Sequence, residues 1–132
     1  VMQSLTDNPV LGHINTFGGH PISCAAGLAA LRVVNDESIL SDVFEKENLF
    51  RSLLIHPHIR AVHSRGLMMA VVFESYAFNK MVIDKLLEKG VFTDWFLFAS
   101  HALRIAPPLT ITTEEITQAC NCLLQVLDEI KH

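Results

Sequence analysis

The spacing of apolar residues changes along this chain, and the change restricts the possible folds more than any other feature. Over residues 38–54 apolar side chains recur about every 3.6 residues and charged side chains fill the remaining positions, which indicates an amphipathic helix. Over residues 59–63 apolar and polar residues alternate, and residues 67–73 form a continuous apolar run of strand length. The break at residues 65–66 predicts that these two strands are joined tightly.

The rest of the chain adds helices and short strands. The alanine-rich residues 21–35 favour a helix that other elements can approach closely, and we expect it to be buried on more than one side. A further helix should end at residues 89–90, and a capping-box pattern at residues 112–115 predicts the start of the last helix. Strands are expected around residues 91–93 and 103–105. The predicted fold is an α+β domain, with a small, mostly antiparallel sheet covered by helices.

Composition limits the class of protein. The 132 residues suffice for one domain with a core, because a chain of this length buries roughly two-thirds of its unfolded surface. Half of the residues are apolar, the formal net charge is −4 and there is no extended basic run, which argues against disorder and against a nucleic-acid-binding face. No apolar run approaches the roughly 18 residues of a membrane span, and residues 1–6 lack the features of a signal peptide. We expect a cytoplasmic protein, and the start at Val1 suggests a segment of a longer chain.

Neither the cysteines nor the histidines predict a metal site. Three cysteines are too few for a disulfide framework, and we expect reduced thiols that are buried or half-exposed. Cys120 and Cys122 would point about 200° apart on a helix, so their sulfurs could not share one ion. His56 and His58 flank Pro57 without an acidic or cysteine cluster nearby, which favours a loop between elements.

Residues 16–21, Thr-Phe-Gly-Gly-His-Pro, form the first candidate functional segment. Gly18 and Gly19 permit backbone angles and close approach that other residues forbid, and Pro21 suits the first position of a helix. A hydroxyl group and backbone N–H groups before a helix can present hydrogen-bond donors to an anion. A plain turn into a helix has the same pattern, and these residues alone do not separate the two interpretations.

Arg104 is the second candidate. It lies between Leu103 and Ile105 in an expected strand and just before a rigid Pro-Pro turn at 107–108, so its direction is restricted. The planar guanidinium matches a carboxylate, which could belong to a ligand or to an acidic residue of the protein. The aromatic-rich residues 94–101 leave a similar choice, between buried core and an apolar wall of a ligand site.

Three segments together resemble one protein family. Residues 16–26, residues 64–68 (Ser-Arg-Gly-Leu-Met) and residues 103–116, which begin Leu-Arg-Ile-Ala-Pro-Pro-Leu-Thr-Ile, are similar in order and spacing to class III pyridoxal-phosphate-dependent aminotransferases of the ornithine, acetylornithine and 4-aminobutyrate type. The resemblance covers essentially the whole chain and concerns the family's C-terminal portion. It implies that residues 1–35 are the end of the large cofactor domain with a connecting helix. Residues 36–132 would be the small C-terminal domain of fold type I transferases.

The resemblance also implies roles for three residues. In the family, the threonine at the position of Thr16 hydrogen-bonds the cofactor phosphate of the neighbouring subunit, and Asn15 stands where a polar residue often assists. The arginine at the position of Arg104 binds the α-carboxylate of the substrate. The implied activity moves an amino group from an amino acid or ω-amine to a 2-oxo acid such as 2-oxoglutarate. The implied cofactor is pyridoxal 5'-phosphate, and the implied assembly is a homodimer.

The chain also departs from the family pattern. The family's Schiff-base lysine lies upstream of the Thr16 segment, so we expect this chain to contain no catalytic residue and to be inactive by itself. His20 replaces the usual asparagine, Met68 replaces a common glycine, and residues 95–98 differ from the usual family sequence. The resemblance therefore does not identify the substrate. The alternative is a non-catalytic α+β domain that binds an anionic metabolite or a partner chain.

Overall fold

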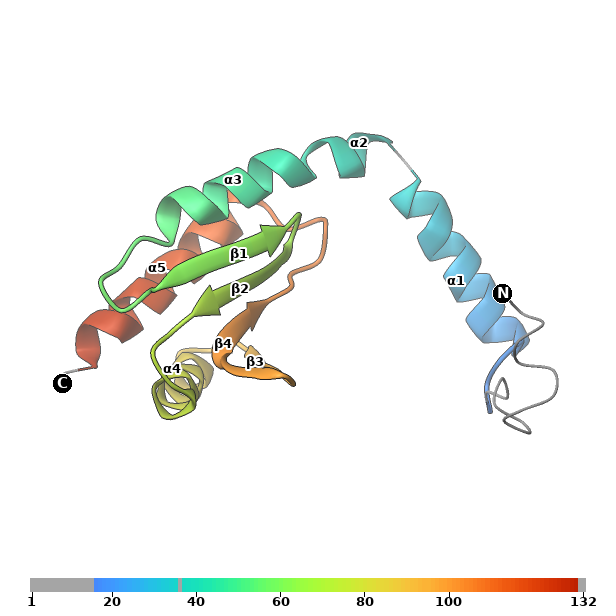
Figure 1. The fold of residues 1–132 in the computed structure, drawn as a ribbon. Coiled ribbons are helices and arrows are strands. Elements are labelled where there is room, and N and C mark those ends of the chain that lie inside the picture. The colour runs from blue at the N-terminus through green and yellow to red at the C-terminus, as the bar shows by residue number, and fades with distance from the viewer. Residues whose placement is uncertain (1–15, 36, 131–132) are drawn as a thin grey trace. The chain divides into compact units, whose positions relative to one another are not determined.

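The computed structural model describes residues 16–35 and 37–130, and its contacts divide the chain into two compact units (Figure 1). The first unit is Val1–Glu37 and the second is Ser38–His132. This division falls close to the boundary between residues 35 and 36 that we expected from the sequence. The assignment of the first unit to a large cofactor domain stays a prediction.

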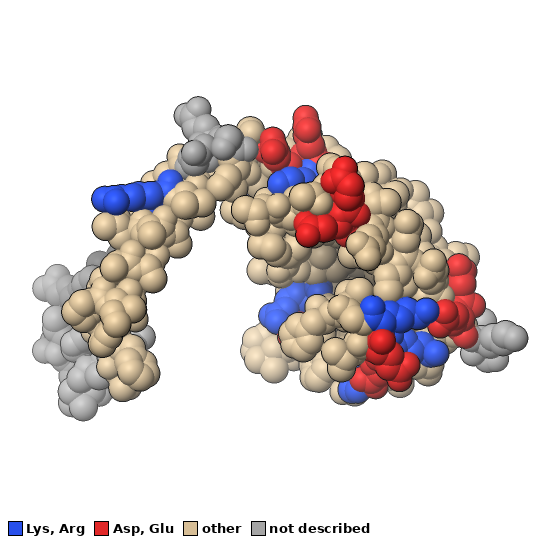
Figure 2. Space-filling view, turned by 180° about the vertical axis from the view of Figure 1, so that it is seen from behind, with Lys and Arg blue, Asp and Glu red and all other residues tan. Residues whose placement is uncertain are grey.

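The described part of the first unit is a turn followed by helix α1, Pro21–Val34. Pro21 occupies the start of the helix as predicted, but the expected burial is wrong, because every residue of α1 is exposed. Ile22 is 74% exposed and Leu31 is 56% exposed. Arg32 is the charged residue of α1, and Figure 2 shows few charged atoms on this helix. Composition predicts the helix, whereas burial depends on a second element that composition does not reveal.

The second unit is an α+β domain built on one antiparallel sheet (Figure 1). Its strands are β1 (Ala61–Arg65), β2 (Met68–Val72), β3 (Asp94–Phe96) and β4 (Ala99–Ile105). Its helices are α3 (Val43–Leu53), α4 (Tyr76–Glu88) and α5 (Thr113–Glu129), and the short α2 (Glu37–Ser41) spans the division between the units. The strand order is β1-β2-β4-β3, and each neighbouring pair is antiparallel. This confirms the predicted fold class.

Two elements differ from the prediction. The helix expected over residues 38–54 is divided at Asp42 into α2 and α3. No strand forms at residues 91–93, where one was expected. Strand β3 begins directly after them, at Asp94. The cause is the end of α4, because the Val91 N–H donates a hydrogen bond to the Leu86 carbonyl at 2.8 Å. The backbone that a strand would use for pairing is therefore engaged by the preceding helix.

The core lies between the sheet and helices α3, α4 and α5. Successive side chains of a strand point to opposite faces, so alternate residues of the central strands face the helices. Met69 and Val71 of β2 and Leu103 of β4 are at most 1% exposed. They belong to one cluster with Phe50 of α3 and Leu127 of α5. The face of the sheet opposite these helices, called the open face here, receives the intervening residues of the same strands.

Candidate functional site

Thr16 begins the turn that leads into α1, and Asn15 lies outside the described residues. The His20 N–H donates to the Phe17 carbonyl at 3.2 Å, and Gly19 adopts a φ of +77°, which glycine tolerates without strain. His20 is the N-cap of α1, but its side chain makes no capping hydrogen bond, and the first helical turn contains no acidic residue. The backbone N–H groups at the start of α1 are therefore not capped by the His20 side chain, and the exposed Thr16 precedes them by a few residues. This donor set fits a phosphate group.

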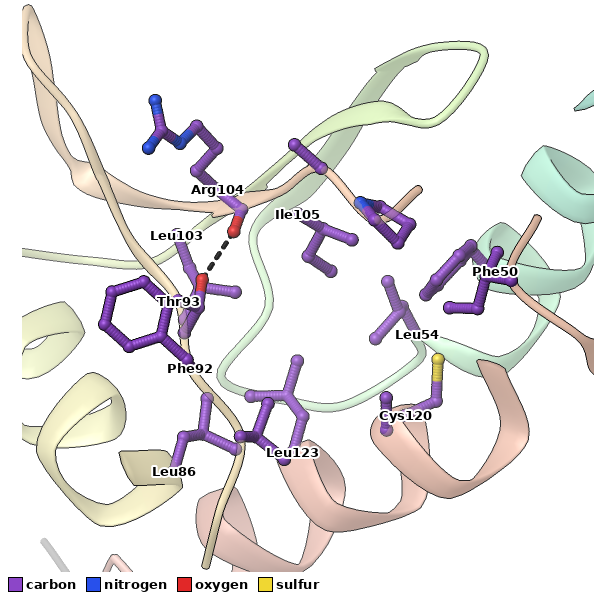
Figure 3. Close-up of a pocket in the computed structure, with 15 residues that line it drawn as sticks. Phe50, Leu54, Leu86, Phe92, Thr93, Leu103, Arg104, Ile105, Cys120 and Leu123 are labelled. Atoms are coloured by element: carbon purple, nitrogen blue, oxygen red, sulfur yellow. Dashed lines mark hydrogen bonds between the residues drawn. The ribbon is translucent and has the colours of Figure 1, made fainter. Parts of the chain in front are cut away.

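Arg104 belongs to the second unit, and its backbone is held on both sides. In the sheet it is in register with Ala70 of β2 and Asp94 of β3. Its carbonyl accepts a hydrogen bond from Thr93 Oγ1 at 2.5 Å. Figure 3 shows its side chain directed away from the apolar core, whereas Leu103 beside it is buried. The strand therefore presents the guanidinium on the open face of the sheet.

The side chain of Arg104 forms an ion pair with Asp94. Arg104 Nη2 lies 2.5 Å from Asp94 Oδ2, and the two side chains are 44% and 40% exposed. Asp94 Oδ1 is buried and makes no hydrogen bond within the described part of the chain. The structure thus contains the pairing with an internal acid that was one of the two alternatives. A guanidinium has five N–H donors, so donors remain for a ligand carboxylate.

Asp94 is the residue that sequence reasoning missed. It pairs with Arg104 because the antiparallel register of β3 and β4 places the two residues directly opposite each other. The strand expected at residues 91–93 would have placed Asp94 in the loop after that strand. The pairing of Asp94 with Arg104 could therefore not be predicted from it. The sequence did contain a signal for this pair, because Asp94 and Arg104 carry opposite charges and are ten positions apart. Such charge pairs across a hairpin stabilise antiparallel strands.

A groove on the open face contains the Arg104 side chain. Its lining residues from the strands are Ala70, Val72 and Ala102, with the polar residues His63, His101 and Arg104. The turn between β3 and β4, residues 96–99, lines the groove as well. Within this turn Leu97 is 80% exposed and Phe98 is 99% exposed. The groove therefore combines a cationic group with an apolar turn.

The aromatic segment divides between the core and the groove. Trp95 is half-buried and packs against the core, with an edge contact to Tyr76 at a ring distance of 5.8 Å. Phe96, also half-buried, and Phe98 line the groove instead. The interpretation as buried core thus holds for Trp95, whereas the interpretation of the segment as a wall of a ligand site stays a prediction for Phe96 and Phe98.

An apolar cavity of about 170 Å³ lies on the core side of β4 (Figure 3). Phe50 of α3, Leu86 of α4 and Cys120 of α5 contribute to its lining. Burial raises the pKa of the Cys120 thiol to about 11, so its sulfur stays protonated at neutral pH and does not act as a nucleophile.

Cys24 of the first unit is exposed, although the sequence predicted a buried or half-exposed thiol. The difference arises because none of the described residues covers α1.

The described residues also bear on metals and membranes. Among residues 16–35 and 37–130, no three His, Cys, Asp or Glu side chains gather in a way that could hold a metal ion. In the same part of the chain, no helix has the length and apolar character needed to cross a bilayer.

The described lysines lack the setting of a lysine that binds a cofactor covalently. Such a lysine needs a lowered pKa, which burial or a nearby positive charge produces. The four described lysines are half-buried or exposed on helices: Lys46, Lys80, Lys85 and Lys89. The hydrogen bond to Glu129 raises the pKa of Lys89, which is the opposite change.

Comparison with known proteins identifies a family. A family model described as Aminotransferase class-III matches residues 1–127. The chain is 36% identical over 124 residues to the acetylornithine aminotransferase of Caldanaerobacter subterraneus subsp. tengcongensis, covering 90% of this chain and 31% of that protein. It is 35% identical over 134 residues to the ornithine aminotransferase of Bordetella pertussis, covering 93% of this chain and 32% of that protein. The chain thus spans about a third of the length of these curated relatives.

Solved structures agree with the sequence relatives. The acetylornithine aminotransferase from Elizabethkingia anophelis has a TM-score of 0.78 and 31% identity, over 89% of this chain and 32% of that chain. A structure of the ornithine aminotransferase from Toxoplasma gondii, with partial occupancy of PLP at its active site, has a TM-score of 0.74 and 32% identity. That match covers 96% of this chain and 30% of the solved chain. These similarities confirm the resemblance that the three sequence segments indicated.

Proposed function

Because this chain belongs to the class III aminotransferase family, we propose that the protein moves an amino group from an amino acid or ω-amine to a 2-oxo acid such as 2-oxoglutarate. Enzymes of this family depend on pyridoxal phosphate, which when bound supplies a ring that takes up electrons from the reacting carbon. The observation that carries the proposal is the setting of Arg104. Its guanidinium projects from a rigid strand into a groove, with N–H donors that Asp94 does not use.

Arg104 would bind the carboxylate of the amino acid and of the oxo acid. Two parallel N–H···O bonds set the plane of a carboxylate as well as its position. The strand pairing and the Thr93 hydrogen bond hold the arginine backbone, so the substrate would be oriented by a rigid element. A misplaced carboxylate would reduce the rate on the order of 10²-fold, because catalysis depends on the geometry of the bound reactant.

Thr16 would hold the phosphate of the cofactor, with Asn15 assisting. The support is local: Thr16 is exposed, the His20 side chain does not cap the N-terminus of α1, and the first turn of α1 contains no acidic residue. Because the family's threonine contacts the phosphate of a neighbouring subunit, the proposed assembly is a homodimer. A cytoplasmic location belongs to the same proposal.

We expect the 132 residues by themselves to be inactive. The four described lysines are half-buried or exposed, and a hydrogen bond to Glu129 raises the pKa of Lys89, which disfavours Lys89 as a nucleophile. In the proposed enzyme, the lysine that binds the cofactor is supplied by sequence other than these lysines. Mixing this chain with pyridoxal phosphate should therefore give no absorbance band of a lysine-bound cofactor.

The proposal is tested with Arg104→Ala in the full-length protein. We expect kcat/KM for 2-oxoglutarate to fall about 100-fold, while an amine donor that has no carboxylate is used at an unchanged rate in its half-reaction. Arg104→Lys keeps the charge without the planar fork and should give an intermediate loss. Unchanged kinetics of Arg104→Ala would exclude the assigned role. If the intact protein transfers no amino group at all but binds carboxylates through Arg104, the non-catalytic alternative is correct.

A further inference from the structure

We infer that His63 is a second binding residue for the substrate carboxylate, which it shares with Arg104 across a gap above Ala70. The inference rests on the proposed function, because it takes Arg104 as the group that binds this carboxylate. It deepens that function by adding an N–H donor on the side of the bound acid that Arg104 does not cover.

The strand pairings place His63 and Arg104 in one row across the sheet. His63 of β1 is opposite Ala70 of β2, and Ala70 is opposite Arg104 of β4. The row ends at Asp94 of β3, which is opposite Arg104 (Figure 1). Residues paired across antiparallel strands point to the same face of a sheet, so these four side chains share the open face. The first three line the groove on that face.

Ala70 leaves a gap between the two side chains that carry nitrogen. Paired residues of antiparallel strands have Cα atoms about 5 Å apart, so two such spacings separate His63 from Arg104 by about 10 Å. Between them, the single methyl group of Ala70 fills little of this space. A carboxylate that accepts a hydrogen bond of about 2.8 Å from each side fits into such a gap.

The ion pair with Asp94 does not compete for this gap. Asp94 lies on β3, on one side of β4, whereas Ala70 and His63 lie on strands on the other side. The hydrogen bond to Asp94 uses Nη2 of the guanidinium, which has further N–H donors on Nη1 and Nε. Arg104 can therefore keep Asp94 on one side and bind a carboxylate on the other.

The imidazole of His63 is available to a ligand. His63 is exposed at the groove, and among the described residues none forms a hydrogen bond or an ion pair with its ring. At least one ring nitrogen of a histidine carries a proton, so the imidazole can donate a hydrogen bond in either tautomer. None of the described residues that line the groove is acidic, so no carboxylate of the groove competes for that donor.

The test is His63→Ala in the full-length protein with pyridoxal phosphate. The imidazole would bind the carboxylate equally in the ground state and in the transition state. Its loss should therefore raise KM for 2-oxoglutarate about tenfold and change kcat by less than about twofold. Butanoate, a carboxylate with neither an amino nor an oxo group, should show a similar rise in its inhibition constant. His63→Gln keeps an N–H donor and should limit both rises to about threefold.

Ala70→Leu tests the gap itself. A leucine side chain would occupy the space between His63 and Arg104, so the same two constants should rise about tenfold. The melting temperature shows whether this variant folds. If it does not fold, the variants of the exposed His63 still decide the question.

Arg65→Ala is the matched control. Arg65 lies on the same face of β1 in the next row, opposite Met68, and it does not line the groove. The variant removes a positive charge from this face without removing a donor of the groove. Because solvent and salt screen exposed charges, both constants should stay within about twofold of the wild type.

The outcomes separate the inference from the proposed function. If His63→Ala leaves both constants unchanged while Arg104→Ala remains impaired, the inference is wrong and the proposed function stands. An equal rise for Arg65→Ala would also overturn the inference, because the effect would then be one of general charge. So would a loss confined to kcat, since His63 would then not act by binding. Unchanged kinetics of both His63→Ala and Arg104→Ala would refute the proposed role of Arg104 itself.

Discussion

The two units of this chain use their apolar residues in opposite ways. Helix α1 consists almost entirely of apolar and small residues, and every one of its side chains is exposed. In α3, α4 and α5 the apolar residues form stripes that close over one face of the sheet, with Phe50 and Val126 at most 2% exposed. Local sequence favours a helix in both units. Tertiary packing among the described residues stabilises only the second.

The largest difference between the units should be seen when apolar side chains are truncated. Phe50→Ala in the core should lower the free energy of unfolding by about 3–5 kcal/mol, because it removes a buried ring and leaves a cavity. Leu31→Ala in α1 removes a side chain that is 56% exposed and should change it by less than about 0.5 kcal/mol. Urea unfolding of the 132-residue chain followed by circular dichroism measures both. Equal losses would contradict the comparison.

The second largest difference between the units should be the rate at which their cysteines react. The thiol of Cys24 is exposed on α1, whereas burial raises the pKa of Cys120 on α5 to about 11. Because the thiolate is the reactive form, we expect iodoacetamide at pH 8 to modify Cys24 about 100-fold faster than Cys120. Mass spectrometry of digested samples taken over time gives both rates. In urea the two rates should converge, and a difference that survives unfolding would show that burial is not its cause.

The helix starts offer a smaller contrast. In α5, Thr112 Oγ1 accepts a hydrogen bond from the Glu115 N–H at 3.2 Å, and Glu115 Oε2 accepts one from the Thr112 N–H at 2.8 Å. Thr112→Ala should therefore lower the free energy of unfolding by about 1 kcal/mol. His20 makes no capping hydrogen bond at the start of α1, so His20→Ala should have an effect within about 0.5 kcal/mol. The same urea titration measures these variants, and a larger loss for His20→Ala would reverse the assignment.

The smallest expected effect is the pH dependence of the stability of the second unit. The hydrogen bond from Lys89 lowers the pKa of Glu129 below 4.5, and the same bond raises the pKa of Lys89 above 10.5. The stabilisation from Glu129 is present above its unfolded pKa and is lost as the pH falls through the folded value. The stabilisation from Lys89 is present below its unfolded pKa and is lost as the pH rises through the folded value. Lys89→Met should flatten the profile of the urea midpoint at both ends; an identical profile would show that the pair contributes nothing.

Parts of the fold and of the candidate site could be predicted because their signals are local. The capping box at Thr112 and Glu115 specifies the start of α5 within four residues of sequence. Strand β2 lies within the apolar run at 67–73. A continuous apolar run of this length indicates a buried strand even when the strand it pairs with is unknown. Arg104 could be singled out because two apolar neighbours and a Pro-Pro turn restrict it, and the structure places it on a strand at a groove.

The sequence by itself determined most of the helices and strands, the α+β class, the family and the two segments that carry candidate site residues, because capping, periodicity and motif spacing act over short stretches of chain. Only the tertiary structure decided that β3 begins at Asp94, that Asp94 pairs with Arg104 and that His63, His101 and the aromatic turn meet at one groove. The physical reason is that strand register and side-chain facing join residues that lie far apart in sequence. A single residue of slip would turn Arg104 toward the core.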